Sequence, residues 1–258
     1  MEGADANHME LIILGAGPAY SNVPGSLGSA YLLRSPVGSI VLDMGQGTFP
    51  SLAALVEPSD LAGVVISHLH PDHFIDLIPL RHYLRRAEAM SDRKLPLLAA
   101  NGLEQRLDSV WGEAGFFAAA FEHRDLDAAS FDVGPFEVQA TAVTHSGHSY
   151  AFRVTSGTAA DRGLVYTGDI GIIEDAEPLV RPGDVILSEA SYGPGPVPEG
   201  MPHIDARAAA EMATRTEASQ LVLTHVRMGM DLEATMSAAS SVFAGPASLA
   251  RPDSRFLV

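Results

Sequence analysis

Four side chains of the kinds that bind metals crowd into six positions of the segment SHLHPDHFIDL, residues 67–77. They are His68, His70, Asp72 and His73. Side chains alternate along an extended segment, so positions 68, 70 and 72 converge on one side, and the fourth turns in where a helix begins. Three imidazoles and a carboxylate suit a divalent metal, and they are more ligands than one tetrahedral ion uses. The segment therefore predicts a site for two metal ions.

Three later segments place a similar side chain where a strand-like run ends. THSGHSYAFRV (144–154), VYTGDIG (165–171) and LVLTHV (221–226) supply His145 or His148, Asp169 and His225. Loops at strand ends, held by a rigid scaffold, are the usual place for functional side chains. We favour His145 as the ligand because it ends the alternating strand, whereas His148 lines the pocket or faces solvent.

This order of motifs, HxHxDH followed by a His, an Asp and a His, resembles the signature of the metallo-β-lactamase superfamily. The likeness runs from the LGAGP turn at 14–18 to His225. The Ser-Tyr pair four residues after His145 is similar to the ribonuclease-Z-like branch. The resemblance implies an α/β fold, a four-layer αββα sandwich of two similar halves with the metal site at the sheet edges.

The resemblance also assigns the ligands. It implies that His68, His70 and His145 bind the first metal, that Asp72, His73 and His225 bind the second, and that Asp169 bridges both. Nitrogen-rich ligation favours zinc, with manganese or iron as the alternatives in a carboxylate-bridged site. Asp72 and Asp169 are accordingly expected to take part in catalysis.

Other carboxylates and one histidine resemble positions of the family outside the ligand set. His203, in MPHIDARAAAEMA, is the expected general acid for the leaving group; a structural histidine at the start of a helix is the alternative. Glu189, in LSEAS, resembles a Glu of the ribonuclease Z branch, but that branch has His where this chain has Ser188, which leaves a shared proton-transfer pair open. Asp43 and Asp76 are candidates to orient ligand imidazoles.

Two divalent ions close together lower the pKa of a shared water and so supply hydroxide at neutral pH. We therefore expect a two-metal hydrolase in which a metal-bridging hydroxide attacks small phosphodiesters. The stretches LGSAYLLRSPVGSIVLDMGQGT, SHLHPDHFIDL and YTGDIG are similar to actinobacterial members that degrade cyclic nucleotides. The alternative is a lactone, thioester or carboxylic ester hydrolase, in which Tyr150 or Tyr192 lies near the metals.

Several function classes are disfavoured. The chain has no Cys, which excludes disulfides and thiolate ligands, including those of one β-lactamase subclass. The interval between His145 and Asp169 is too short for the tRNA-gripping arm of ribonuclease Z. Lys and Arg number 16 against 32 Asp and Glu, a formal net charge of −16, which offers few contacts to phosphates of long nucleic acids. A ribonuclease-Z-type nuclease and an inactive, metal-bound regulatory protein are the less favoured readings.

Apolar and alternating runs predict the elements that position these residues. Strands are expected at 10–15, 30–35, 38–43, 63–67, 95–100, 136–144, 150–155, 163–169, 184–190, 220–225 and 255–258, and helices at 50–57, 74–89, 101–120, 205–218 and 231–243. GAGPAY at 15–20 is interpreted as a structural turn, because it lacks the third glycine of a dinucleotide fingerprint. Residues 10–258 are expected to form one domain, and residues 1–9 a disordered tail or a cloning remnant.

The chain lacks the features of a membrane or exported protein. No apolar run approaches the roughly 20 residues that span a bilayer. The start, MEGADANHM, has neither a basic region nor an apolar core of a signal peptide. We expect a cytoplasmic protein that acts on a small molecule, with neither a membrane nor a long nucleic acid as partner; a homodimer is left open.

Overall fold

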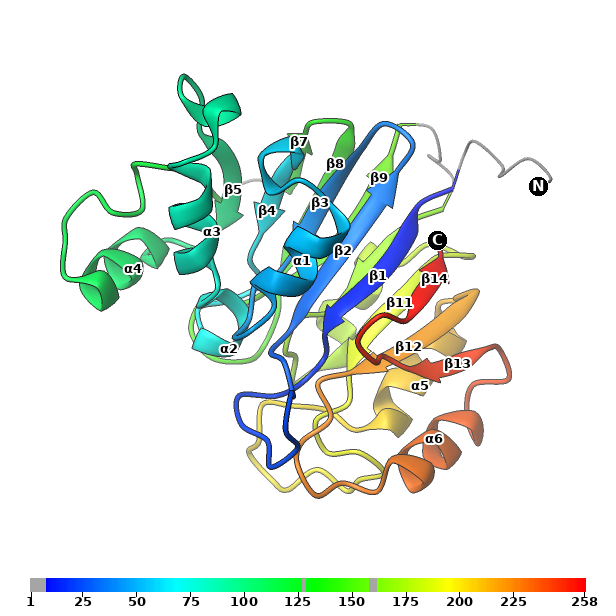
Figure 1. The fold of residues 1–258 in the computed structure, drawn as a ribbon. Helices are drawn as coiled ribbons and strands as arrows, with labels where there is room; N and C mark the ends of the chain where they lie inside the picture. Colours follow the sequence, from blue (N-terminus) through cyan, green and yellow to red (C-terminus); the bar gives the residue numbers. More distant parts are fainter. Residues whose placement is uncertain (1–7, 127–128, 158–161) are drawn as a thin grey trace.

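The computed structural model describes residues 8–126, 129–157 and 162–258 of the chain, which form two facing seven-stranded sheets (Figure 1). The first sheet has the order β14 (Arg255–Leu257), β1 (Glu10–Gly15), β2 (Ala30–Ser35), β3 (Gly38–Leu42), β4 (Gly63–Val65), β5 (Leu95–Ala99) and β6 (Phe121–Asp125). The second has the order β13 (Ala247–Leu249), β12 (Gln220–Thr224), β11 (Val185–Glu189), β10 (Leu164–Tyr166), β9 (Tyr150–Ser156), β8 (Phe136–Ala142) and β7 (Ser130–Val133).

Helices cover the outer face of each sheet. They are α1 (Phe49–Leu55), α2 (Pro71–Phe74), α3 (Leu77–Leu84) and α4 (Leu103–Trp111) on the first sheet, and α5 (Ala206–Arg215) and α6 (Leu232–Ser240) on the second. Short 3₁₀ turns lie at η1 (Pro58–Asp60), η2 (Glu88–Met90), η3 (Ile173–Asp175) and η4 (Glu177–Leu179). The layers are therefore helix, sheet, sheet and helix.

The alternation of side chains along β1 explains why both faces of the first sheet are covered. Ile12 and Leu14 are buried against the helices, whereas Leu11 and Ile13 are buried between the sheets. A strand turns successive side chains to opposite faces, so a continuous apolar run suits a strand with both faces covered. Phe152 of β9 joins the core between the sheets, which confirms the predicted αββα sandwich.

The covering of the second sheet depends on small residues. Ala209, Ala210 and Ala213 of α5 are fully buried against β11 and β12, so the helix backbone can lie close to the sheet. Asp205 caps this helix, because its Oδ1 accepts a hydrogen bond from Ala208 N at 2.9 Å. The cap fixes where α5 begins, directly after the segment that carries His203.

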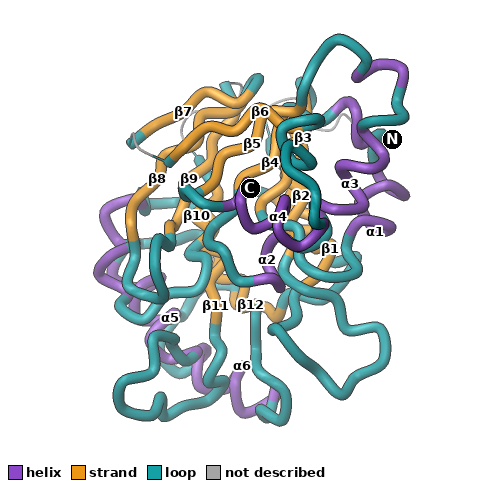
Figure 2. Tube along the Cα trace, turned by 90° about the vertical axis from the view of Figure 1, so that its left-hand side faces the viewer, coloured by secondary structure: helices purple, strands orange, loops and turns teal. Residues whose placement is uncertain are grey.

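Parallel strands bring the ends of both sheets to one edge of the molecule. In the first sheet β3, β4 and β5 run parallel, and in the second β10, β11 and β12 do. Their carboxyl ends therefore open into loops on the same side, and Figure 2 shows these loops gathered beyond one end of the strands. The predicted ligands all lie in or next to this group of loops.

The prediction of one helix over 101–120 is wrong beyond α4. The helix stops at Gly112, which takes the left-handed φ of 81°. Asp108 then accepts hydrogen bonds from the backbone of Gly115 and Phe117, and these bonds fold the chain into turns before β6. The strand β6 was not expected, and neither were the edge strands β7 and β13.

The helix expected at 74–89 is divided between α2 and α3, and α3 already ends at Leu84. The tail expected over 1–9 is wrong at Met9, which is fully buried and whose carbonyl accepts a hydrogen bond from Val258 N at 2.8 Å. Residues 1–7 lie outside the described residues. Among the residues that are described, no helix has the length and apolar character to cross a membrane.

Candidate metal centre

The predicted ligands meet in two adjoining groups at the edge of the sheets. One group contains His68, His70, His145 and Asp169; the other contains Asp72, His73 and His225. Within each group, the nitrogen or oxygen atoms that would serve as ligands lie within 4.8 Å of one another. The structure thus divides the predicted residues as the resemblance implied, with Asp169 reaching the second group through His73 at 3.5 Å and His225 at 3.7 Å.

Pro71 organises the first-sheet loop that carries four of these residues. A residue before proline avoids the helical region, and His70 is accordingly extended, with φ −82° and ψ 140°. Proline also suits the first position of a helix, and α2 begins at Pro71. Pro71 therefore keeps His70 extended and starts the helix that carries Asp72 and His73.

Two residues at strand ends adopt the left-handed backbone region. Asp43, after β3, has φ 58°, and His225, after β12, has φ 56°. Such conformations are uncommon outside glycine and occur often at functional sites. Each is fixed by a backbone hydrogen bond, from Asp43 N to Val65 O at 2.8 Å and from His225 N to Ala16 O at 3.1 Å.

Neighbouring groups fix the orientation of the imidazoles. Four have Nδ1 within hydrogen-bond distance of a partner and turn Nε2 to the centre: His68 with Ser67 Oγ (3.1 Å), His73 with Asp43 Oδ2 (2.7 Å), His145 with Pro202 O (2.7 Å) and His225 with Ser191 Oγ (3.0 Å). His70 is reversed, because its Nε2 lies 2.9 Å from Ser146 Oγ and its Nδ1 faces His145. Such partners hold an imidazole in the geometry and tautomer that a metal requires.

Asp43 is the centre of a buried network that joins the two sheets. Besides its contact with His73, it accepts hydrogen bonds from the backbone and side chain of Ser67 and from Tyr166 Oη at 2.6 Å. Tyr166 belongs to β10 of the second sheet, and Asp43 follows β3 of the first. The structure places Asp43 against a ligand imidazole, as predicted from the sequence.

The polar atoms at the centre are suited to a bound cation. His68 Nε2, His73 Nε2 and Asp169 Oδ1 are buried and have no hydrogen-bond partner in the described residues. A buried polar atom without a partner costs about 1–3 kcal/mol, so such atoms call for an explanation. A metal ion that accepts their lone pairs provides one, and the residues present therefore fit divalent metals.

The charges of the site residues also suit a bound cation. Burial opposes ionisation of Asp169, but the imidazoles of His225, His73 and His68 outweigh it and lower the pKa of this carboxyl. Burial also lowers the pKa of His68 well below its ordinary value, which favours the neutral form that can donate a lone pair to a metal. For His73 the carboxylates of Asp169 and Asp43 overcome burial and raise the pKa to about 9. The site attracts positive charge.

Glu189 and His203 form a pair beside the centre. His203 Nδ1 lies 2.9 Å from Glu189 Oε1 and 4.0 Å from Asp169 Oδ2. Burial lowers the pKa of His203, but its hydrogen bond and charge interaction with Glu189 raise it more, so the net shift is upward. Ser188 thus does not prevent a His–Glu pair: the histidine comes from the segment before α5.

The contacts of three further residues bear on minor expectations from the sequence. Asp76 Oδ2 accepts a hydrogen bond from Phe49 N at 2.8 Å, so this carboxylate anchors the start of α1, and the expectation that it orients an imidazole is wrong. His148 is exposed and lies outside both ligand groups, but it lines one hollow together with His70 and another together with Tyr150. Tyr192 is buried, with its ring 6.4 Å from that of His203.

Sequence reasoning missed the residues that support the ligands from behind. Ser191 and Tyr166 carry no sign of their role in the sequence, because their partners His225 and Asp43 are far away in the chain. Ser67 precedes His68, which it contacts, but its hydrogen bonds to Asp43 are not visible from the sequence. Arg227 was missed as well, although it follows His225 by two positions. Its guanidinium lies 4.8 Å from the centre of the Tyr192 ring. A cation so close to a ligand motif is a signal that a search restricted to metal-binding residues passes over.

Residues 40–226 match the family described as the Beta-lactamase superfamily domain. The uncharacterized protein Rv1339 of Mycobacterium tuberculosis is 30% identical over 229 residues, which is 86% of this chain and 83% of the relative. The probable metallo-hydrolase YhfI of Bacillus subtilis is 24% identical over 226 residues, covering 86% of this chain and 89% of YhfI. The chain belongs to the beta-lactamase superfamily.

Solved structures share the fold over nearly the whole chain. The crystal structure of YhfI has a TM-score of 0.85 at 20% identity and covers 97% of this chain and 100% of its own. The short form of human tRNase Z has a TM-score of 0.71 at 21% identity, covering 96% and 98%. A diphosphatase of the PhnP family has a TM-score of 0.74 at 15% identity, covering 96% and 97%. Fold and site together define a metallo-hydrolase of this superfamily.

Proposed function

We propose that the protein is a binuclear, metal-dependent phosphodiesterase that acts on small phosphodiesters, with cyclic nucleotides as the first candidates. The observation that carries the proposal is the convergence of three groups of side chains on Asp169: each of the two ligand groups, and the pair of Glu189 and His203. Ligands for metals and a group that can deliver a proton thus lie side by side, as hydrolysis of an ester requires.

His68, His70 and His145 would hold one divalent ion, Asp72, His73 and His225 the other, and Asp169 would lie between them. When bound, two such ions supply a nucleophile from water at neutral pH and stabilise negative charge on the attacked group. Nitrogen supplies most of the ligand atoms, which favours zinc. The hydrogen bonds to Nδ1 of four imidazoles keep the ligand atoms in position before any ion binds.

His203 would protonate the leaving oxygen. In hydrolysis of a phosphodiester, phosphorus gains the oxygen of water, the bond to the leaving oxygen breaks, and that oxygen needs a proton. Glu189 occupies Nδ1 of His203, which leaves Nε2 to carry the proton, and its hydrogen bond and charge raise the pKa of the imidazole despite the opposing effect of burial, so that the protonated form is favoured. Glu189 is itself fixed by backbone donors, Ile170 N at 2.7 Å and Ser191 N at 3.2 Å.

A small substrate is supported by the chain itself. The interval between His145 and Asp169 is too short in sequence for an inserted arm that could hold an RNA, and the formal net charge of −16 disfavours long polyanions. Two neighbours in fold, a PhnP-family diphosphatase and human tRNase Z, are named for reactions at phosphate groups. These likenesses favour a substrate that is attacked at phosphorus over a lactone or thioester that is attacked at its carbonyl carbon.

The test is the initial rate of 3′,5′-cyclic AMP hydrolysis by protein loaded with zinc or manganese. Asp169→Ala serves as the blank, since it removes the carboxylate that both ligand groups share. We expect saturable turnover that is absent from the blank. If the loaded protein cleaves lactones or thioesters but neither cyclic AMP nor bis(p-nitrophenyl) phosphate, the phosphodiesterase proposal is wrong.

A further inference from the structure

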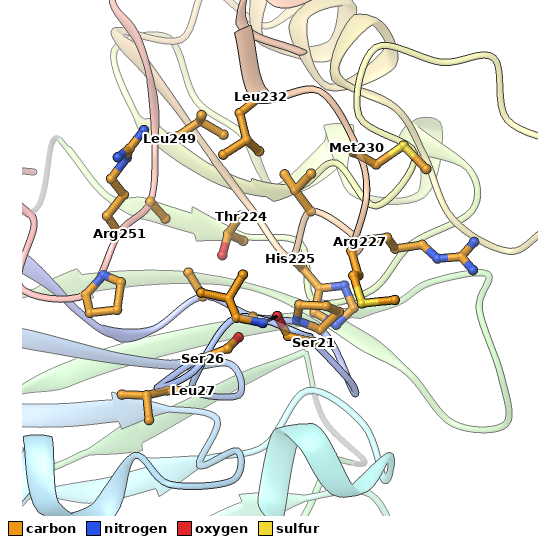
Figure 3. Close-up of a pocket in the computed structure, with 18 of the residues that line it drawn as sticks. Ser21, Ser26, Leu27, Thr224, His225, Arg227, Met230, Leu232, Leu249 and Arg251 are labelled. Atoms are coloured by element: carbon orange, nitrogen blue, oxygen red, sulfur yellow. Dashed lines mark hydrogen bonds between the residues drawn. The ribbon is translucent and has the colours of Figure 1, made fainter. Parts of the chain in front are cut away.

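A pocket of about 390 Å³ lies directly against the metal centre, on the side of His225. Three segments form it: the loop after β1, the end of β12 with the loop that follows, and the loop after β13. Figure 3 shows that His225 forms part of its wall. A pocket of this size suits a small organic molecule. His225, which belongs to one of the two ligand groups, is the residue that the pocket and the metal centre share.

The lining of this pocket is mostly apolar, with a few hydroxyl groups. Leu232 and Leu249 lie on one side and Leu27 on the other, while Ser26 and Thr224 contribute hydroxyls (Figure 3). Such a surface suits the base and sugar of a nucleoside, which combine an apolar face with a few hydrogen-bonding groups. It offers little to a phosphate group.

The positive charge of the pocket is placed at the metal end. Arg227 is half-buried, with its guanidinium 4.8 Å from the centre of the Tyr192 ring and one nitrogen 3.4 Å from Tyr20 Oη. Its backbone donates a hydrogen bond to Ser191 O, and Ser191 Oγ contacts His225. Figure 3 shows Arg251 on the opposite side of the pocket, and that side chain is exposed.

The neighbours of Arg227 prepare it to bind an anion. Tyr20 and Tyr192 restrict the guanidinium, and among the described residues no carboxylate forms an ion pair with it. The ring of Tyr192 that it covers lies 6.4 Å from the ring of His203, so the positive charge lies close to the group that would deliver the proton. In a chain with a formal net charge of −16, a guanidinium held at this point indicates a negatively charged substrate.

We propose that this pocket holds the organic group of the phosphodiester and that Arg227 binds a non-bridging oxygen of its phosphate, which makes Arg227 a specificity-determining residue. The proposal rests on the proposed function and deepens it. Guanidinium groups bind phosphate through parallel charge-assisted hydrogen bonds. A neutral lactone or ester gains nothing from them, so Arg227 selects anionic substrates over neutral ones that the same metals could attack.

Binding measurements separate the two parts of this proposal. Isothermal titration calorimetry of metal-loaded protein with inorganic phosphate and with AMP tests the anion site and the pocket in turn. Arg227→Gln is expected to lower the affinity for both ligands by about tenfold or more, because a charge-assisted hydrogen bond to the phosphate is lost. Leu232→Trp places a larger side chain in the pocket from α6. It is expected to lower the affinity for AMP by at least about tenfold and the affinity for phosphate by less than about twofold.

Arg86→Gln is the matched control, since Arg86 is an exposed arginine that follows α3. Metal content and cooperative unfolding are measured for each variant, and Arg227→Lys, which keeps the charge, is expected to restore part of the phosphate affinity. If Arg227→Gln binds both ligands as the wild type does, or Leu232→Trp binds AMP normally, the inference is wrong. These affinities do not require turnover, so a protein that binds AMP through Arg227 but cleaves no phosphodiester overturns the proposed function alone.

Discussion

The two sheets contribute to the metal centre in different ways. The first sheet supplies four ligand-type residues from one short segment, residues 68–73, whose position is set by a single proline. The second supplies His145, Asp169 and His225 from three separate loops, together with the pair of Glu189 and His203. The compact segment identifies the family, whereas the dispersed loops carry the groups that decide which reaction the site performs.

This difference predicts that residues from the loops of the second sheet contribute more to the individual steps of the reaction than residues of the first-sheet segment do. We assign to its residues the bridging of the metals, the delivery of a proton and the binding of substrate, and these residues lie on several separate loops. The first-sheet segment is held as one unit by Asp43 and Pro71. Substitutions in the second sheet should therefore separate the individual steps of the reaction, beginning with the residue on which all groups converge.

Asp169→Ala is expected to have the largest effect. The substitution removes the carboxylate that faces His68, His73 and His225, so the imidazoles lose the negative charge that lies between the two groups. Turnover should fall to background, and bound metal should fall from two ions per chain towards one or none. Elemental analysis with the cyclic AMP assay measures both. Asp92→Ala, an exposed loop carboxylate, is the control, and a fully active Asp169→Ala would contradict the two-metal mechanism.

His203→Gln is expected to lower kcat by roughly 10²–10⁴-fold, the usual contribution of a general acid, while metal content stays at the wild-type value. The reason is that His203 contacts Glu189 and stands beside the ligands without belonging to either group of them. Glu189→Gln should lower kcat less, because it acts through His203. His82→Gln is the control for loss of an imidazole away from the site, since His82 lies on α3 with its ring against Trp111 of α4. Loss of metal from His203→Gln would mean that His203 is structural.

Tyr166→Phe tests the hydrogen bond that joins the sheets behind the site. It removes the donor to Asp43, a fully buried carboxylate, and should lower the free energy of unfolding by about 2 kcal/mol. Tyr31→Phe is a matched control, since Tyr31 is also fully buried but pairs with the neutral Thr224, and it should cost about 1 kcal/mol. Urea unfolding measures both. An equal loss in the two variants would show that the charge of Asp43 adds nothing to this bond.

The same contrast explains what the sequence could predict of the site. The HxHxDH segment is visible because its members are neighbours in the chain. The contact between Glu189 and His203 is not visible, since it depends on how the segment before α5 returns to the end of β11. Asp76 was assigned to an imidazole because it lies near the motif, but the structure uses it for the start of α1.

The fold could be predicted where burial imposes a pattern. Strands β1 and β2 agree with the expected 10–15 and 30–35, because apolar side chains fill both of their faces. β6 and β7 were missed because FEHRD and SFDV are polar and form the edge strands of the two sheets, where pairing depends on the neighbouring strand more than on hydrophobicity. The expected helix over 101–120 failed because Gly112 and Asp108 end it by local hydrogen bonds that apolar spacing does not reveal.

His148→Ala is expected to have the smallest effect and decides between the two histidines of one loop. His148 is exposed, whereas the side chain of His145 is buried and contacts Pro202 O through Nδ1. We expect kcat/KM of His148→Ala within about twofold of the wild type, as for a surface substitution, because His148 is exposed and belongs to neither ligand group although it lines a hollow beside His70. His145→Ala, its matched partner, should lose metal and activity together. Loss of metal from His148→Ala instead would transfer the ligand role to His148 and require the loop to rearrange around the ion.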